Sequence, residues 1–290
     1  MPVNQKCAIL ISFFLFFVKL FEGVERLIHR TYLKMIYKMK NVIKLAVMAV
    51  VCMTMVSCMS VNFGSTDVDH TPTQVPELNK PTAMQPFDKV DIANAFKVIY
   101  EQGTEHSVRV EASEEAFKEM TVYVKDNSLC IRKAVKNPKM SLKEIKVFVT
   151  SPTIKSIEIA GSGVFAASNK INVTDDLRME IAGSGKMLLA DVTCKDSNME
   201  IAGSGNIEVG NIAARDVRAE IAGSGDINLA TMTCNKFHIE IAGSGNVTSD
   251  NITADDVHAE IAGSGDVTLK GKVKHHTKDI AGSGKVKIEE

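Results

Sequence analysis

One five-residue motif, Ile-Ala-Gly-Ser-Gly, recurs seven times in the C-terminal half of this 290-residue chain. Consecutive copies are 22, 20, 20, 20, 20 and 19 residues apart, and they begin at Ile159, Ile181, Ile201, Ile221, Ile241, Ile261 and Ile280. A unit of this length is too short to bury a core of its own. The regular spacing therefore predicts the stacked coils of a solenoid.

The pattern inside each repeat predicts strands. Between Ile221 and Glu240, apolar residues alternate with polar or small ones, which is the period of a half-buried strand. The residues expected to face inward are Ile221, Ile227, Leu229, Met232, Cys234, Phe237 and Ile239. Three short strands and their turns would complete each coil. The predicted fold class is all-β, a right-handed parallel β-helix with about 20 residues per coil and rungs about 4.8 Å apart.

The Gly-Ser-Gly element fits a tight corner because glycine adopts positive φ without steric penalty. A serine between glycines also invites comparison with a hydrolase nucleophile. That elbow, however, reads Gly-x-Ser-x-Gly and occurs once per enzyme, next to a base. Seven equivalent serines favour a structural role for the corner.

A secretion signal is expected near the start of the chain. Met39, Lys40 and Lys44 precede an apolar run over 45–56, which ends at Cys58 in a lipobox-like sequence. We expect residues 39–58 to be a lipoprotein signal peptide, with Cys58 lipidated and anchoring the protein to a membrane. An ordinary signal peptide or a single membrane anchor is the alternative. Residues 1–38 are interpreted as a misannotated extension upstream of the true start at Met39; a further membrane helix is the alternative.

The rest of the chain divides into three parts by composition. Residues 59–86 contain four of the seven prolines and are predicted to be a flexible tether. Residues 87–157 are predicted to be an irregular, β-rich N-terminal part of the β-helix, with a turn at Asp126-Asn127 and a short helix capped by Ser113. Residues 158–290 hold the regular coils.

Charge and cysteine content exclude several functions. A formal net charge of -1 gives no electrostatic preference for nucleic acid. Beyond Cys58 three cysteines remain, Cys130, Cys194 and Cys234. Cys194 and Cys234 are two coils apart, about 9.6 Å, which is too far for a disulfide. No cysteine spacing matches a metal site, so neither a metal nor another cofactor is expected.

An acid precedes every repeated isoleucine, and stacking would align these acids into an outward ladder. Neighbouring carboxylates about 4.8 Å apart repel by about 1 kcal/mol even in water, so partners are required. Basic residues two positions upstream can supply them across coils. We call this surface the acidic strip, and its residues are Glu158, Glu180, Glu200, Glu220, Glu240 and Glu260 with Arg178, Arg218, His238 and His258. It is either a charge-paired, solvated face or a strip that binds a cation or a partner.

Two more specific chemical functions, calcium binding and carbohydrate cleavage, are possible on such a repeat. Asp226 and Asp266 follow Gly-Ser-Gly, as in calcium-binding toxin repeats, but asparagines stand between them and the period is 20 instead of nine. A carbohydrate-active enzyme, a lyase or glycosidase on a β-helix, would need one coil that breaks the repetition to place an acid and a base. No coil departs in this way, and tryptophan is absent.

The segments Phe87-Asp88-Lys89-Val90-Asp91-Ile92, Phe96–Tyr100 and Leu129-Cys130-Ile131, with coils such as Gly205-Asn206-Ile207, resemble the head GIN domain family. That family is described as putative autotransporter adhesin heads, was formerly a domain of unknown function, and is frequent in lipoproteins of the Bacteroides group. The resemblance covers about residues 87–290. It implies a β-helical fold and a cell-envelope location, and it implies no catalytic residues.

These observations lead to a functional hypothesis. We expect a non-enzymatic, lipid-anchored protein of the cell envelope, on the periplasmic or the surface face of the outer membrane, which acts as an adhesin or binding scaffold. Its ligand would be a surface protein or glycan. The alternative is the carbohydrate-active enzyme on the same fold. A groove with clustered acids would favour that alternative. Self-association into a homo-oligomer is compatible with either.

Overall fold

The computed structural model describes residues 76–134 and 145–289. The expectations for the extension, the signal peptide and Cys58 fall outside these residues, as does most of the tether. Within the described part of the chain, no helix is long and apolar enough to cross a membrane.

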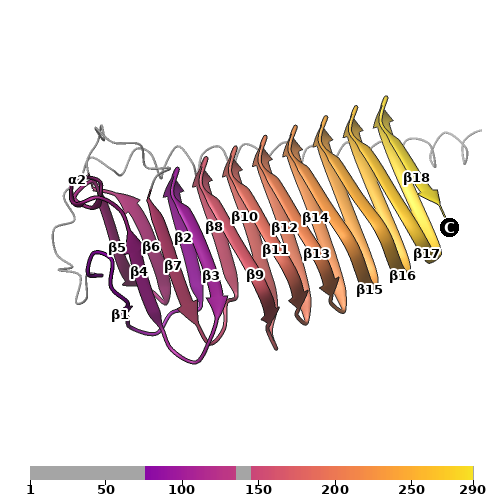
Figure 1. Ribbon diagram of the computed structural model, residues 1–290. Helices are drawn as coiled ribbons and strands as arrows, with labels where there is room; N and C mark the ends of the chain where they lie inside the picture. The colour runs from indigo at the N-terminus through magenta and orange to yellow at the C-terminus, as the bar shows by residue number, and fades with distance from the viewer. Residues whose placement is uncertain (1–75, 135–144, 290) are drawn as a thin grey trace, which may run out of the picture. The chain divides into compact units, whose positions relative to one another are not determined.

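The described residues form eighteen strands of one continuous sheet system and a single short helix (Figure 1). The helix, α2, spans Glu114–Phe117. The strands before the motif repeats are β1 Thr82–Ala83, β2 Lys89–Asn94, β3 Lys97–Gln102, β4 Ser107–Glu111, β5 Met120–Lys125, β6 Ser128–Lys133 and β7 Lys146–Ser151. The strands of the repeats are β8 Ser156–Gly161, β9 Val164–Asn172, β10 Leu177–Gly183, β11 Lys186–Thr193, β12 Asp196–Gly203, β13 Asn206–Ala213, β14 Asp216–Gly223, β15 Asp226–Gly243, β16 Asn246–Gly263, β17 Asp266–Gly282 and β18 Lys285–Glu289.

The repeats wind into the parallel β-solenoid that their spacing predicts. Ile201 of β12 pairs in parallel with Ile181 of β10 on one side and with Ile221 of β14 on the other. The same register continues through β15, β16 and β17. Every copy of the motif therefore lies at the same corner of its rung, and the rungs succeed one another along the stack (Figure 1).

The interior of the stack consists of apolar columns. All seven residues predicted to face inward in the coil from Ile221 are buried, with at most 6% of their surface exposed. One column contains Met187, Ile207, Ile227, Val247 and Val267, and each of these is fully buried. Burial of this kind is the main source of stability in a solenoid, since a single coil exposes its apolar interior on both sides.

The corner depends on both glycines of Gly-Ser-Gly. Gly203 has a φ of 125°, and a Cβ there would lie 2.4 Å from the carbonyl oxygen of Gly183. A Cβ on Gly205 would lie 2.5 Å from the Cγ2 of Ile181. The intervening Ser204 is exposed, and its backbone N–H donates to the Gly183 carbonyl at 2.9 Å. The repeated serines thus connect consecutive rungs through their main chain.

The residue after Gly-Ser-Gly continues this connection. The Oδ1 atoms of Asp226, Asn246 and Asp266 each accept the backbone N–H of the equivalent residue in the next rung, at 3.0, 3.1 and 2.8 Å. These aspartates and asparagines therefore bridge the corners of successive rungs. Their recurrence has this structural reason and does not require bound calcium.

A bend divides the strand that follows the corner. In β13 the side chains of Ile207 and Val209 are buried, the next two residues, Gly210 and Asn211, are not, and Ile212 is buried again. Alternation is interrupted because two successive residues face outward. The burial pattern of β13 therefore divides it into two short segments, in line with the prediction that each coil contains several short strands.

The N-terminal rungs are stacked out of chain order. β2 pairs in parallel with both β6 and β8, and β3 with both β7 and β9. The first rung made by the chain therefore lies second in the stack, between the later β6–β7 rung and the β8–β9 rung (Figure 1). The irregular N-terminal coils are continuous with the repeats, but their order in space differs from their order in sequence.

Antiparallel strands cover the outer side of these N-terminal rungs. β5 forms a hairpin with β6, and β4 pairs with β7 and with β1. The hairpin turns at Asp126 and Asn127, which both have positive φ, in agreement with the prediction. Ser113 caps α2 by accepting the Ala116 N–H at 3.2 Å. The antiparallel strands bury apolar side chains such as Val110 of β4 and Val122 of β5.

Candidate functional site

Two surfaces of the solenoid gather polar side chains on a regular scaffold. The first is the acidic strip, which runs along the strands that precede the corner. Its glutamates lie on β8, β10, β12, β14, β15 and β16, and the parallel registers place each one beside the next. The structure therefore brings together all ten residues that the sequence assigned to this surface.

Arginines on the acidic strip bridge consecutive rungs. Arg178 pairs with Glu180 of its own rung and, through Nη2, with Glu200 of the next at 3.2 Å. Arg218 repeats this arrangement two rungs later, with Glu220 and with Glu240 at 2.5 Å. Each guanidinium group thus offsets the repulsion between two stacked carboxylates.

Serine, asparagine and histidine side chains also contact carboxylates of the strip. Ser156 donates to Glu158 at 3.1 Å and Asn198 to Glu200 at 2.6 Å. His238 Nε2 lies 2.6 Å from Glu240, and its ring stacks on His258, with centroids 5.1 Å apart. His258 Nε2 lies 2.9 Å from Glu260, and its Nδ1 lies 2.6 Å from Thr277 Oγ1.

Local electrostatics follow from these contacts. The hydrogen bond with His238 lowers the pKa of Glu240, as does the nearby positive charge of Arg218, against the opposing effect of burial. Glu220 is the most buried carboxylate of the strip, with 7% of its side chain exposed. Its Oε1 contacts Arg218, whereas its Oε2 is buried without a hydrogen-bond partner.

The described residues contain no cluster of three or more His, Cys, Asp or Glu side chains arranged to hold a metal ion. The thiols of Cys194 and Cys234 are buried, and burial raises their pKa to about 11 and about 12. They occupy one inward column with Ala214 and Ala254, so they act as small apolar residues. Cys130 is also a free, buried thiol with a raised pKa.

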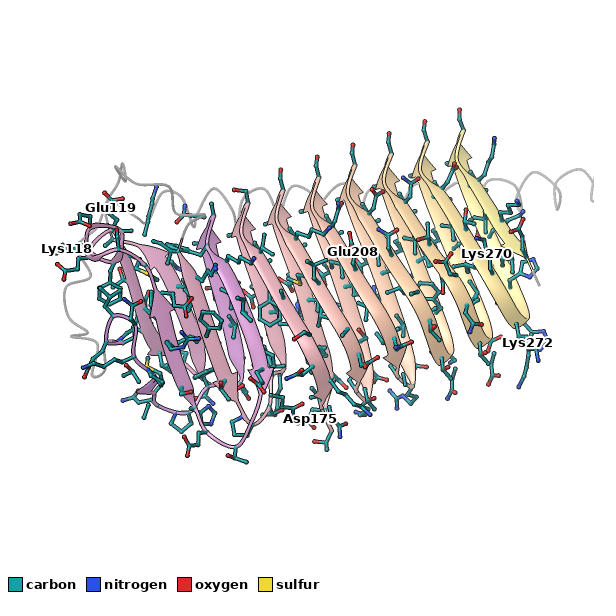
Figure 2. The ribbon with its side chains drawn as sticks, in the orientation of Figure 1. Lys118, Glu119, Asp175, Glu208, Lys270 and Lys272 are labelled. Atoms are coloured by element: carbon teal, nitrogen blue, oxygen red, sulfur yellow. The ribbon has the colours of Figure 1, made fainter. Side chains whose placement is uncertain are left out.

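The second surface is a shallow groove on the strands that follow the corner. It has a volume of about 510 Å³ and crosses β9, β11, β13, β15 and β16. Its lining residues are Ala166, Ala167, Ser168, Leu188, Leu189, Ala190, Glu208, Val209, Gly210, Asn228, Leu229, Ala230, Thr248 and Asp250. Figure 2 shows Glu208 and, beyond the groove, Lys270 over the strands of this face.

Small residues at the bend form the floor of the groove. Ala190, Gly210 and Ala230 occupy equivalent positions in three successive rungs, at the first outward residue of the bend. Gly210 is held close to its neighbour, because a Cβ there would lie 2.4 Å from the Ala190 carbonyl oxygen. The lack of long side chains in this column is what hollows the surface.

Polar side chains line one side and one end of the groove. Glu208 pairs with Lys186 at 2.7 Å, and Asp250 with Lys270 at 3.5 Å. Thr248 Oγ1 donates to Asn228 Oδ1 at 2.8 Å. Both carboxylates of the groove therefore have a lysine partner, and the groove offers hydrogen-bond donors together with acceptors.

The sequence pattern did not predict this groove. Its signal is a column of small residues, Ser168, Ala190, Gly210 and Ala230, that lies two positions after Ala166, Leu188, Glu208 and Asn228. Strand alternation alone assigns no special place to these small residues. Their importance follows from the bend, which interrupts the alternation and places these residues at the surface.

Comparison with known proteins identifies what the chain is similar to. The family model described as putative auto-transporter adhesin, head GIN domain, matches residues 86–288. Comparison with curated proteins gives no match.

Solved structures share the fold. A putative adhesin from Bacteroides fragilis has 23% identity and a TM-score of 0.66, with 74% of this chain and 97% of that chain covered. A putative adhesin from Parabacteroides distasonis has 18% identity and a TM-score of 0.61, with coverage of 72% and 95%. A protein from the same species, described as a putative lipid binding protein, has 24% identity and a TM-score of 0.56, with coverage of 76% and 98%.

Proposed function

Because the chain belongs to the head GIN domain family of putative auto-transporter adhesins, we propose that it is a non-enzymatic adhesin or binding scaffold of the cell envelope. The observation that carries this proposal is the family match over residues 86–288, which includes nearly all of the solenoid. Membership of an adhesin family implies a surface or envelope protein. The rigid stack would then present a side chain at the same position every rung.

The surface chemistry supports a binding role over a catalytic one. In the acidic strip, arginine, histidine, serine and asparagine side chains contact the six glutamates. In the groove, Glu208 and Asp250 pair with lysines. General acid–base catalysis instead needs a carboxyl group positioned to exchange a proton with substrate. A hydrolase or lyase assay on polysaccharides tests the alternative, and turnover that Glu208→Gln or Asp250→Asn abolishes would establish the enzyme.

The location proposed for this scaffold is a membrane surface, with Cys58 as the lipidated residue. The support is the sequence of residues 39–58, where basic residues and an apolar run precede the cysteine. Growth with a clickable fatty acid should label the wild-type chain and leave Cys58→Ala unlabelled. On cell fractionation, the wild type should be found in the membrane pellet and Cys58→Ala in the soluble fraction. Equal labelling of the two would remove the lipoprotein proposal.

Adhesion itself is tested by binding. Cells that display the protein, and matched cells that lack it, are compared for retention on epithelial surfaces, mucin and extracellular-matrix proteins. We expect higher retention of the displaying cells on at least one surface. Equal retention on every surface would overturn the adhesin proposal.

A further inference from the structure

We propose that the groove across β9, β11, β13, β15 and β16 binds a neutral glycan chain that lies along the axis of the stack. This inference rests on the proposed function, because it names the class of ligand that the scaffold would hold. It concerns a surface apart from the acidic strip, since the strip is built on the strands before the corner and the groove on those after it.

The first argument is the shape of the groove. Its floor consists of Ala190, Gly210 and Ala230, so an extended ligand can approach the backbone of three consecutive rungs. The volume of about 510 Å³ is within the range of small-ligand sites. The lining has a repeat of about 4.8 Å along the stack. A linear polymer with a short, regular repeat is the ligand that such a lining fits.

The second argument is charge. The carboxylates of Glu208 and Asp250 each lie beside a lysine, Lys186 at 2.7 Å and Lys270 at 3.5 Å. The groove therefore carries no excess of either sign to select an ionic ligand. A neutral ligand enters without the desolvation cost of an unpaired charge.

The third argument is hydrogen bonding. Successive rungs place Glu208, Asn228 and Thr248 at equivalent positions beside the floor. The bond from Thr248 uses the carbonyl end of the Asn228 amide, which leaves its nitrogen as a donor for a ligand. A row that both donates and accepts matches hydroxyl groups, which do the same. Leu188 and Ala166 at one end offer apolar surface for the C–H faces of sugar rings.

The backbone of the groove disfavours a peptide. β11 pairs with β9 and β13, and β15 pairs with β13 and β16, all in parallel ladders. The N–H and C=O groups of these strands are therefore committed to neighbouring rungs. An extended peptide gains much of its affinity by adding as a strand to an open edge, and this face presents none. No aromatic side chain lines the groove, so we expect weak binding per site.

The test is direct binding by the full chain. The probes are neutral hexasaccharides of β-1,4-glucan, α-1,4-glucan and β-1,4-mannan, with an acidic galacturonate hexasaccharide and a peptide array for comparison. Ala230→Ile fills the floor with an apolar, strand-favouring side chain. Thr233→Ile places the same isoleucine side chain on the same strand at an exposed position outside the groove, and serves as the matched control. Asn228→Ala removes the amide without filling the floor.

We expect the wild type to bind at least one neutral hexasaccharide. Ala230→Ile should weaken this binding at least about tenfold, Asn228→Ala should weaken it about fivefold, and Thr233→Ile should leave it unchanged. Thermal melts check that each variant is folded; if Ala230→Ile is not, Asn228→Ala still decides the matter. Equal affinity of the wild type and both groove variants would overturn the inference, as would preference for the acidic glycan or for peptides.

The same variants separate this inference from the proposed function. Cells that display the wild type are compared with cells that display Ala230→Ile. If both are retained equally on a surface that cells lacking the protein do not bind, the protein is an adhesin that does not use the groove. In that case only the glycan inference fails. If the wild type binds neither glycans nor any surface, both the inference and the adhesin proposal fail.

Discussion

The N-terminal rungs and the motif-built rungs are held by the same parallel ladders, yet they are assembled differently. In the regular part each rung pairs with the rungs that precede and follow it in sequence, so that Ile201 contacts residues 20 positions away on either side. In the N-terminal part Val90 of β2 pairs with Leu129 and with Ile157, which are 39 and 67 residues further along. Regular rungs are therefore interchangeable, whereas the N-terminal rungs are each needed in place.

Deletion of whole rungs is expected to give the largest difference between the two regions. Removal of residues 206–225 joins Gly205 to Asp226, which is the equivalent of Asn206 one rung later, so the register survives. We expect this variant to fold and to melt cooperatively at a somewhat lower temperature, because it loses one nearest-neighbour interface. Removal of residues 89–102, which form β2 and β3, takes out the rung between β6–β7 and β8–β9. We expect that variant not to fold.

Circular dichroism and thermal melts measure both outcomes. A ten-residue deletion, 206–215, is the control for chain shortening, since it shifts every later rung out of register and should prevent folding. If the 20-residue deletion unfolded the protein as completely as the removal of β2 and β3, the regular rungs would not be interchangeable.

Ion pairs between rungs differ in burial in the two regions. Arg132 of β6 donates to Asp91 of β2 at 2.8 Å, and their side chains are only 12% and 14% exposed. In the regular part Arg178 bridges to Glu200 with 53% of its side chain exposed. We expect Asp91→Ala to destabilise the fold by about 3–5 kcal/mol, because it leaves a buried guanidinium unpaired. Arg178→Ala should cost about 0.2–1 kcal/mol.

Urea denaturation at neutral pH gives both values. The double change of Asp91→Leu with Arg132→Met provides a matched control, since it replaces the buried pair by apolar side chains and should recover most of the loss. Comparable costs for Asp91→Ala and Arg178→Ala would show that burial does not distinguish the two regions.

The same contrast explains what the sequence could predict. The repeat spacing was enough to predict the β-solenoid, its register and its buried columns, because each strand pairs with the equivalent residues of an adjacent coil. The sequence also predicted that residues 87–157 are rich in strands, and β2 to β7 lie there. It did not reveal that β2 lies between β6 and β8, since alternation carries no information on which distant strand is the neighbour.

The candidate sites divide in the same way. The acidic strip was predictable because its glutamates share one position in each repeat, and its arginine partners stand two residues upstream. The groove was not, because it depends on the bend after Val209 and on what the small side chains of Ala190, Gly210 and Ala230 leave open. A hollow is a property of several rungs together, and no single repeat encodes it.

Corners also differ between the two regions. In the regular rungs the first glycine of the corner has a φ of 125° at Gly203. In the β2 rung the equivalent residue is Asn94, with a φ of 80°, and it pairs with Gly161. We expect Gly203→Ala to cost about 1–3 kcal/mol, because its Cβ would meet a carbonyl oxygen and its φ disfavours a side chain. Asn94→Gly should change stability by less than about 1 kcal/mol.

Denaturation curves of the two variants provide this comparison, with Ala202→Gly on the same strand as the control for glycine content alone. Were Gly203→Ala as stable as the wild type, the corner would tolerate a side chain, and the recurrence of glycine would need another explanation.

The smallest effect expected is the pH dependence carried by Glu240 in the regular part. Its pKa lies below the ordinary value of 4.5, chiefly because of the hydrogen bond with His238. A carboxyl group with a lowered folded-state pKa stabilises the fold above 4.5 and loses that contribution as the pH falls through the folded value. Glu240→Gln should therefore cost at most about 1 kcal/mol at neutral pH, and the difference from the wild type should shrink in acid. Glu158→Gln, whose partner is the hydroxyl of Ser156, is the matched change at the N-terminal end of the strip. A difference between wild type and Glu240→Gln that stayed constant from pH 7 to pH 3 would show that the ionised carboxylate contributes nothing to holding these rungs together.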